Sequence, residues 1–330
     1  MREFGYLRAP DVPGAVALHG ADGGTRFLAG GTNLVDLMKA GVERPERLVD
    51  VTGLPLGGIE PTADGGLRIG ATVSNSDLAA HPQVRLQYPA LSQAVLAGAS
   101  GQLRNMATVG GNLLQRTRCA YFTDLAQPCN KRTPRSGCSA IAGEHRNHAI
   151  LGATEHCVAV HPSDMGVALA AFDAVVSYET LDGPGEMPLA DFYLPVADTP
   201  HRETALPPGA LITGVTLPSA PVAARSRYRK VRERASYAFA IGSLAAALDV
   251  RDGLVHDVRL AFGAVASRPW RAHAAERALT GGPASAEAFA AAADAELAAA
   301  APLPHNGYKV TLMRNLVVAV LTELAEGAGR

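Results

Sequence analysis

Short apolar runs alternate with amphipathic stretches through the first two thirds of the chain. Runs rich in β-branched residues, bounded by Gly, Pro, Asn or Asp, predict strands at residues 26–29, 47–51, 67–71, 151–160, 174–179 and 211–217. Helical spacing predicts helices at residues 35–39, 75–80, 89–99 and 165–172, with Ser74 or Asn75 and then Ser163 as caps. The alternation indicates two successive α/β units, divided where Pro55 interrupts residues 53–58. The proline-rich residues 194–209 are predicted to be a domain linker.

The last third has a different pattern. Residues 225–232 alternate as an exposed or edge strand, which by default leaves Lys230 in solvent, and residues 244–250 and 254–263 predict a hairpin around an Asp-Gly turn. An alanine-rich helix at residues 285–301 precedes a final helix. The apolar stripe of that helix is Val310, Met313, Val317, Val320 and Leu324. This part is predicted to be a hairpin packed on helices.

Two glycine pairs occur at comparable places in the first two units. The first is Ala29, Gly30, Gly31, Thr32, Asn33 and Leu34, and the second is Thr108, Val109, Gly110, Gly111 and Asn112. A strand, a glycine turn and a helix start let backbone N–H groups approach an anion. One such turn by itself is better explained as a plain tight turn, whereas two could hold the two phosphates of one pyrophosphate.

Asp164 follows Ser163 at the start of a predicted helix. A carboxylate in the first helical turn is favoured by the helix dipole, and this explanation needs no ligand. The functional alternative is that Asp164 accepts hydrogen bonds from ligand hydroxyls.

All four cysteines of the chain, Cys119, Cys129, Cys138 and Cys157, lie within one polar segment. Nearby basic residues would lower the thiol pKa values and balance a thiolate cluster. The absence of a Cys-x2-Cys pair disfavours zinc, so an iron–sulfur cluster is the preferred interpretation; two disulfides or inert buried thiols stay open. Without a covalent or metal tie, a loop of this length and polarity is expected to be disordered.

Composition narrows the class of protein. The 330 residues are 48% hydrophobic with a formal net charge of -1, which predicts no nucleic-acid binding. The chain shows no run of about 18 uncharged apolar residues and no export signal, so membrane insertion is not expected. It also shows no Ser/His/Asp triad or paired acidic residues at catalytic spacing, so we assign it no catalytic residue of its own.

Taken together, residues 29–34, 108–113, 163–164 and 228–230 resemble, in order and spacing, the FAD-binding medium subunits of the molybdenum hydroxylase family, which includes xanthine dehydrogenases and carbon monoxide dehydrogenases. The resemblance covers nearly the whole chain. Residues 115–157 resemble the insertion that carries a [4Fe–4S] cluster in the flavin subunits of periplasmic aldehyde oxidoreductases. The insertion of 4-hydroxybenzoyl-CoA reductases is a related possibility.

The resemblance implies an α+β fold with a PCMH-type FAD-binding domain of two α/β subdomains. These would span residues 1–57 and 58–224, and a C-terminal α+β domain of the CO dehydrogenase flavoprotein type would span residues 225–330. The implied FAD contacts are Ala29, Gly30, Gly31, Thr32, Asn33, Leu34, Thr108, Gly111, Asn112, Asp164, Ile212 and Lys230. The implied ligands of the [4Fe–4S] cluster are Cys119, Cys129, Cys138 and Cys157.

The function implied is electron transfer within a heterotrimer. A molybdopterin-containing large subunit would oxidise an aldehyde, a [2Fe–2S] small subunit would carry the electrons, and the FAD of this chain would deliver them to an acceptor. Location would be periplasmic through export with a partner, or cytoplasmic. The alternatives are a stand-alone PCMH-type FAD oxidase, the flavin subunit of a 4-hydroxybenzoyl-CoA reductase-like enzyme, and an iron–sulfur scaffold without flavin.

Overall fold

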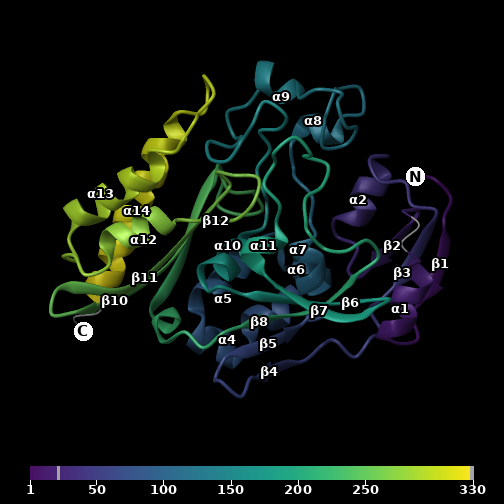
Figure 1. Cartoon of the computed structure of the whole chain (residues 1–330), viewed down its shortest axis with the longest axis horizontal. Coiled ribbons are helices and arrows are strands. Elements are labelled where there is room, and N and C mark those ends of the chain that lie inside the picture. Colours follow the sequence, from purple (N-terminus) through teal and green to yellow (C-terminus); the bar gives the residue numbers. More distant parts are fainter. Residues whose placement is uncertain (21–22, 328–330) are drawn as a thin grey trace.

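Three separate β-sheets organise the computed structural model, which describes residues 1–20 and 23–327 (Figure 1). The N-terminal sheet is parallel with the order β1-β3-β2 and is accompanied by two helices. Its elements are β1 Gly5–Arg8, α1 Val12–His19, β2 Thr25–Leu28, α2 Leu34–Lys39 and β3 Arg47–Asp50. The predicted strand, glycine turn and helix are therefore present, and the turn lies at the carboxyl end of β2, where loops of parallel sheets commonly bind ligands.

The second sheet is antiparallel throughout, with the order β4-β5-β8-β6-β7. Its strands are β4 Ile59–Pro61, β5 Leu67–Gly70, β6 Val175–Thr180, β7 Gly183–Pro188 and β8 Leu211–Leu217. Because β8 occupies the centre of this sheet, residues 194–209 connect two parts of one unit. The prediction that they form a domain linker is wrong, since proline content marks an irregular connection but not its place between domains.

Helices cover the second sheet and bury its apolar side chains. The core includes Leu67, Leu91 and Met165, each 1% exposed or less. Ser74 and Ser163 cap α3 and α10 as expected, each accepting a hydrogen bond from a backbone N–H of the first turn. The helices are α3 Asn75–Ala80, α4 Pro82–Gln87, α5 Pro89–Ala97, α6 Gly101–Met106, α7 Val109–Leu113, α10 Asp164–Ala171 and α11 Leu189–Phe192.

The cysteine segment, residues 115–157, lies at the top of Figure 1 and contains only α8 Ala120–Thr123 and α9 Ser139–Ala142. The strand predicted at residues 151–160 is absent, and the prediction is wrong. Gly152 has a φ of 59°, Thr154 and Cys157 bridge each other, and the N–H groups of Ile150 and Leu151 both donate to Val265 O. Apolar composition alone does not distinguish such a docked loop from a strand.

The C-terminal part forms an antiparallel sheet with the order β12-β11-β10-β9, covered by three helices. The predicted hairpin and final helix are confirmed, with Met313, Val317 and Val320 completely buried. The elements are β9 Ser226–Val231, β10 Gly242–Arg251, β11 Leu254–Gly263, β12 Trp270–Arg271, α12 His273–Leu279, α13 Ala286–Leu297 and α14 Tyr308–Gly327, preceded by the 3-10 helix η1 Pro221–Arg225.

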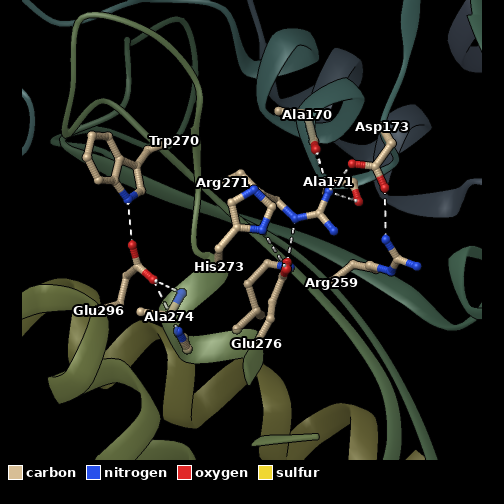
Figure 2. A network of polar contacts seen from close by, with 12 residues as sticks. Ala170, Ala171, Asp173, Arg259, Trp270, Arg271, His273, Ala274, Glu276 and Glu296 are labelled. Atoms are coloured by element: carbon tan, nitrogen blue, oxygen red, sulfur yellow. Dashed lines mark hydrogen bonds and ion pairs between the residues drawn. The ribbon is translucent and has the colours of Figure 1, made fainter. Parts of the chain in front are cut away.

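A polar network joins the second and third sheets (Figure 2). Arg271 on β12 points at the end of α10, where its Nη1 atom donates to Ala170 O and Ala171 O at 2.8 Å and pairs with Asp173 Oδ1 at 2.9 Å. Its Nε atom donates to Glu276 on α12. The side chain is 10% exposed. This contact fixes the C-terminal domain against α10, the helix that begins at Asp164.

Candidate functional site

The loop between β2 and α2 presents a row of unused backbone donors. None of the N–H groups of residues 29–34 donates a hydrogen bond within the described part of the chain. Gly31 has a φ of 70°, as expected for a tight glycine turn. A Cβ atom on Gly30 would lie 1.7 Å from Met106 O, so the loop packs against the connection between α6 and α7. Close packing on one side and free donors on the other suit an anionic ligand.

The second glycine pair differs from the prediction of a turn with free N–H groups. Thr108 caps the short helix α7, and its Oγ1 accepts from Gly111 N at 3.2 Å. The N–H groups of Val109 and Gly110 donate to Val73 O and Ala71 O at 3.0 and 2.9 Å. These donors serve the fold, and an added Cβ on Gly111 would meet only Thr108 Oγ1 within 4 Å. This segment can therefore contact a ligand through its side chains and has open space at Gly111, but the N–H groups of Val109 and Gly110 are already used.

Hydrogen bonds connect the two glycine segments to the start of α10. Asn33 Oδ1 accepts from Arg116 N at 2.8 Å. Asn112 Oδ1 accepts from Ser163 Oγ at 2.6 Å and from Gln115 Nε2 at 2.8 Å. The sequence separates these residues widely, and the structure brings Asn33 against the residue that follows Gln115 and brings Asn112 against Ser163.

Asp164 and Lys230 form an ion pair inside the protein, with Asp164 Oδ2 2.8 Å from Lys230 Nζ. Their side chains are 8% and 3% exposed, so the default that leaves Lys230 in solvent is wrong. Lys230 Nζ also donates to Ala97 O at 3.2 Å. Burial raises the pKa of Asp164, and the charge and hydrogen bond of Lys230 oppose that rise. Tyr228 was not predicted as a site residue. Its hydroxyl donates a hydrogen bond to Asp164 Oδ1.

Ile212 lies on β8 in the apolar core of the second unit and is 3% exposed. Its neighbours in that core include Met165 and Tyr228, on the elements that carry Asp164 and Lys230. The strand thus supplies an apolar wall to this region of the fold.

The four cysteines are free thiols and gather in space. Cys129 and Cys138 face each other across an antiparallel bridge. Cys119 packs against one apolar cluster that contains Cys129 and against another that contains Cys157. No group of three or more His, Cys, Asp or Glu side chains in the described residues is arranged to hold a single metal ion.

Burial dominates the chemistry of these thiols. It raises the pKa of Cys119 and raises that of Cys157 to about 11, although the charge of Lys131 acts in the opposite direction on Cys157. For Cys119 the expectation that nearby basic residues lower the thiol pKa is wrong, because burial raises it. Some of the nearby basic side chains bind other groups. Arg132 Nη1 donates to the carbonyls of Tyr121 and Phe122, at 3.0 and 2.7 Å.

Ion pairs of Lys131 and Arg116 attach the cysteine segment to Glu203 and Glu43. Lys131 Nζ lies 2.7 Å from Glu203 Oε1, Arg116 Nε contacts the other oxygen of Glu203, and Arg116 Nη1 lies 2.6 Å from Glu43 Oε1. Within the segment, Asn130 accepts from Gly137 N at 2.8 Å and donates to His156 O at 2.9 Å. The segment is therefore tied by polar contacts of its own.

The far end of the cysteine segment is bound to the C-terminal domain. Lys309, which is completely buried, donates to Asn147 O and His148 O at 3.0 Å and to Ala264 O at 2.6 Å. Burial lowers the pKa of Lys309 to about 7. Local sequence offers no signal for this contact, because only the tertiary fold brings α14 to residues 145–149.

Comparison with known proteins agrees with this architecture. Residues 2–220 match the family model described as the FAD binding domain in molybdopterin dehydrogenase, and residues 226–324 match the CO dehydrogenase flavoprotein C-terminal domain. No helix in the described residues is both long and apolar enough to cross a membrane.

Among relatives, the chain is 52% identical to the aldehyde oxidoreductase FAD-binding subunit PaoB of Escherichia coli, with 98% of each chain covered. It is 25% identical to the glyceraldehyde dehydrogenase medium chain of Sulfolobus acidocaldarius, over 84% of this chain and 82% of that one. Among solved structures, carbon monoxide dehydrogenase from Hydrogenophaga pseudoflava matches with a TM-score of 0.75 at 26% identity, covering 97% of this chain and 96% of that chain. Quinoline 2-oxidoreductase from Pseudomonas putida matches with a TM-score of 0.76 at 22% identity, covering 99% and 98%, and shows the shared fold. The chain therefore belongs to the FAD-binding subunits of the molybdenum-dependent aldehyde oxidoreductase and carbon monoxide dehydrogenase family.

Proposed function

We propose that this chain is the electron outlet of a molybdenum-dependent aldehyde oxidoreductase. It receives electrons from the [2Fe–2S] clusters of a small subunit, after a molybdopterin-containing large subunit has oxidised the aldehyde, and passes them through FAD to an acceptor. The observation that carries the proposal is 52% identity, along nearly the full length, to an aldehyde oxidoreductase FAD-binding subunit. The free N–H groups of residues 29–34 support it independently.

The residues present fit FAD. Unpaired backbone donors at Ala29, Gly30, Gly31, Thr32, Asn33 and Leu34 suit a pyrophosphate, and Thr108, Gly111 and Asn112 border the same site. Asp164 and Lys230 supply buried charges for the polar parts of the flavin, and Ile212 supplies apolar contact. When bound, FAD supplies the capacity to accept and release electrons. The protein holds and orients it and excludes water around Asp164.

We also propose that Cys119, Cys129, Cys138 and Cys157 ligate one [4Fe–4S] cluster. Four free thiols that gather in one segment, with Cys129 and Cys138 facing each other and Cys119 between the clusters that contain Cys129 and Cys157, are the donor set that such a cluster requires.

Each domain range proposed from the sequence contains one β-sheet. The ranges 1–57, 58–224 and 225–330 contain the parallel sheet, the five-stranded sheet and the four-stranded sheet in turn.

We propose that the complex is a heterotrimer. Its location would be periplasmic after export with a partner, or cytoplasmic.

The test is co-expression of the chain with large and small subunits of this family, followed by anaerobic purification. We expect a three-subunit complex that oxidises aldehydes, with one FAD and about four irons and four sulfides per complex beyond the share of the partners. The chain alone should retain FAD without oxidising aldehydes. Aldehyde oxidation by the isolated chain would instead support a stand-alone oxidase, and iron without FAD would support a scaffold.

A further inference from the structure

One cysteine of the proposed cluster has a histidine beside its sulfur. His148 Nε2 lies 3.2 Å from Cys119 Sγ, within hydrogen-bond distance for sulfur. A cluster-bound thiolate carries no proton, so the imidazole N–H must be the donor in this contact. The contact places one side-chain hydrogen bond directly on a sulfur that would face iron.

The position of His148 is set from the C-terminal domain. Its carbonyl accepts from Lys309 Nζ at 3.0 Å and from Asn306 Nδ2 at 3.3 Å. The carbonyls on either side are held too, Asn147 O by Lys309 at 3.0 Å and Ala149 O by Asn306 at 3.1 Å. Two side chains thus hold three successive peptide groups, which fixes where the His148 ring can lie.

The burial of Lys309 and Asn306 opposes folding, so we expect these two side chains to have a role. Lys309 and Asn306 are both completely buried, and within the described residues Lys309 Nζ donates to three carbonyls with no carboxylate among its partners. Burying an ammonium group without a counter-ion opposes folding. Apolar side chains would fill the same space at lower cost, whereas only hydrogen-bond donors can hold these carbonyls.

We propose that Lys309 and Asn306 position His148 so that its Nε2–H donates to the Cys119 sulfur and raises the reduction potential of the [4Fe–4S] cluster. The inference rests on the proposed function, because it requires the cluster. Reduction adds negative charge, and a hydrogen bond to a cluster sulfur stabilises the more negative state. His148, Lys309 and Asn306 are positioning residues in this account and do not ligate iron.

The test uses the anaerobic complex and an EPR-monitored dithionite titration of the four-iron cluster. His148→Phe should shift the reduced-to-oxidised ratio at a given potential about tenfold toward the oxidised form, which is ~59 mV for a one-electron couple. His148→Gln retains an N–H donor and should recover part of the shift, and Lys309→Met should move the potential in the same direction as His148→Phe. The control is His201→Ala, since His201 is an exposed histidine of another loop.

A second measurement needs no substitution. Pulsed EPR of the unaltered complex before and after exchange into D2O should detect an exchangeable proton coupling that His148→Phe removes, beside the coupling of the Ala159 N–H, which donates to Cys157 Sγ at 3.4 Å and stays in the variant. An unchanged potential in an iron-replete His148→Phe complex, or no such proton in the unaltered complex, would overturn the inference. Failure of the proposed function looks different, because the unaltered complex would then lack the additional four irons and sulfides.

Discussion

At the scale of single residues, the two glycine segments make different demands on their glycines. A Cβ on Gly30 would lie 1.7 Å from Met106 O, whereas a Cβ on Gly111 would meet only Thr108 Oγ1, at 3.0 Å. Gly30→Ala must therefore displace one of two packed backbones, at a cost of about 3 kcal/mol. Gly111→Ala should cost less than about 1 kcal/mol in the protein freed of FAD. Urea unfolding of the two FAD-free variants measures the difference, and equal midpoints would contradict it.

The buried ion pair leads to a prediction about coupling. Lys230→Met leaves the Asp164 carboxylate without its cation in a site that is 8% exposed, and it should lower the free energy of unfolding by about 3 to 5 kcal/mol. The double variant with Asp164→Leu removes both charges and should be more stable than Lys230→Met alone. The comparison by denaturant unfolding contradicts this account if the double variant loses the sum of the two single losses.

The Asp164–Lys230 pair shows which features cannot be predicted from the local sequence. The alternation of residues 226–231 correctly predicts a strand, and the cap at Ser163 is correctly predicted from its type and position. The alternation does not reveal that the end of α5 packs over this strand. This packing buries Lys230, whose Nζ donates to Ala97 O. The family resemblance, and not local periodicity, is what pointed to Lys230.

At the scale of elements, the cysteine segment depends on charges that belong to other parts of the chain. Burial alone would raise the pKa of Glu203, but Lys131 and Arg116 outweigh it and hold the pKa below the usual 4.5. A carboxyl group whose pKa is lower in the folded state stabilises the protein above pH 4.5, and this contribution is lost as the pH falls through the folded-state pKa. Glu203→Gln should remove that contribution.

We expect Glu203→Gln to lower the free energy of unfolding at pH 7 by about 3 kcal/mol, because Lys131 remains buried without its carboxylate. The loss should shrink as the pH falls from 4.5, where Glu203 of the unfolded chain becomes protonated, through the lower pKa that Glu203 has in the folded protein. Urea unfolding from pH 7 to pH 3 measures both effects. Glu155→Gln is the control, since Glu155 is 83% exposed, and a Glu203→Gln loss that does not depend on pH would contradict the account.

Element prediction succeeded where a strand or helix has its own periodicity and failed where tertiary contacts decide. Residues 211–217 and 308–327 carry such periodicity and form β8 and α14. Residues 151–160 are apolar because they dock on the loop after β11 through Val265, and not because they form a strand. The N–H groups of Val109 and Gly110 were expected to be free, but Val73 and Ala71 supply acceptors that no local pattern reveals.

At the scale of the whole molecule, the division into two α/β units and a C-terminal α+β part follows from the order of periodic segments, and each part has its own sheet. The relative placement of the parts does not follow, because it rests on contacts between residues that are distant in the sequence. These are the apolar core that Ala245 and Ala261 share with the second part, and polar contacts beside it. Arg271 is the clearest example, joining Ala170, Ala171 and Asp173 to α12 across the domain boundary (Figure 2).

Arg271→Met is therefore expected to loosen the C-terminal domain from α10 while leaving each core intact. The variant loses charge-assisted hydrogen bonds at a side chain that is 10% exposed, which should lower stability by about 3 kcal/mol. Amide hydrogen exchange should accelerate at the end of α10 and in β12 and α12, while the parallel N-terminal sheet should exchange as before. Because the proposed FAD contacts include Asp164 on α10 and Lys230 on β9 of the C-terminal domain, the variant should also release FAD faster.

Arg314→Met provides the matched control, since Arg314 is 40% exposed and has one ion pair, with Asp294, between α13 and α14. Such an exposed pair is worth about 0.5 kcal/mol, so this variant should keep its FAD and its exchange pattern. If Arg271→Met and Arg314→Met exchanged and released FAD alike, the contact at Arg271 would not be what holds the domains together. If Arg271→Met accelerated exchange equally in all three sheets, the effect would be global unfolding, and the fixed angle between domains would have to come from the apolar contacts that surround Arg271.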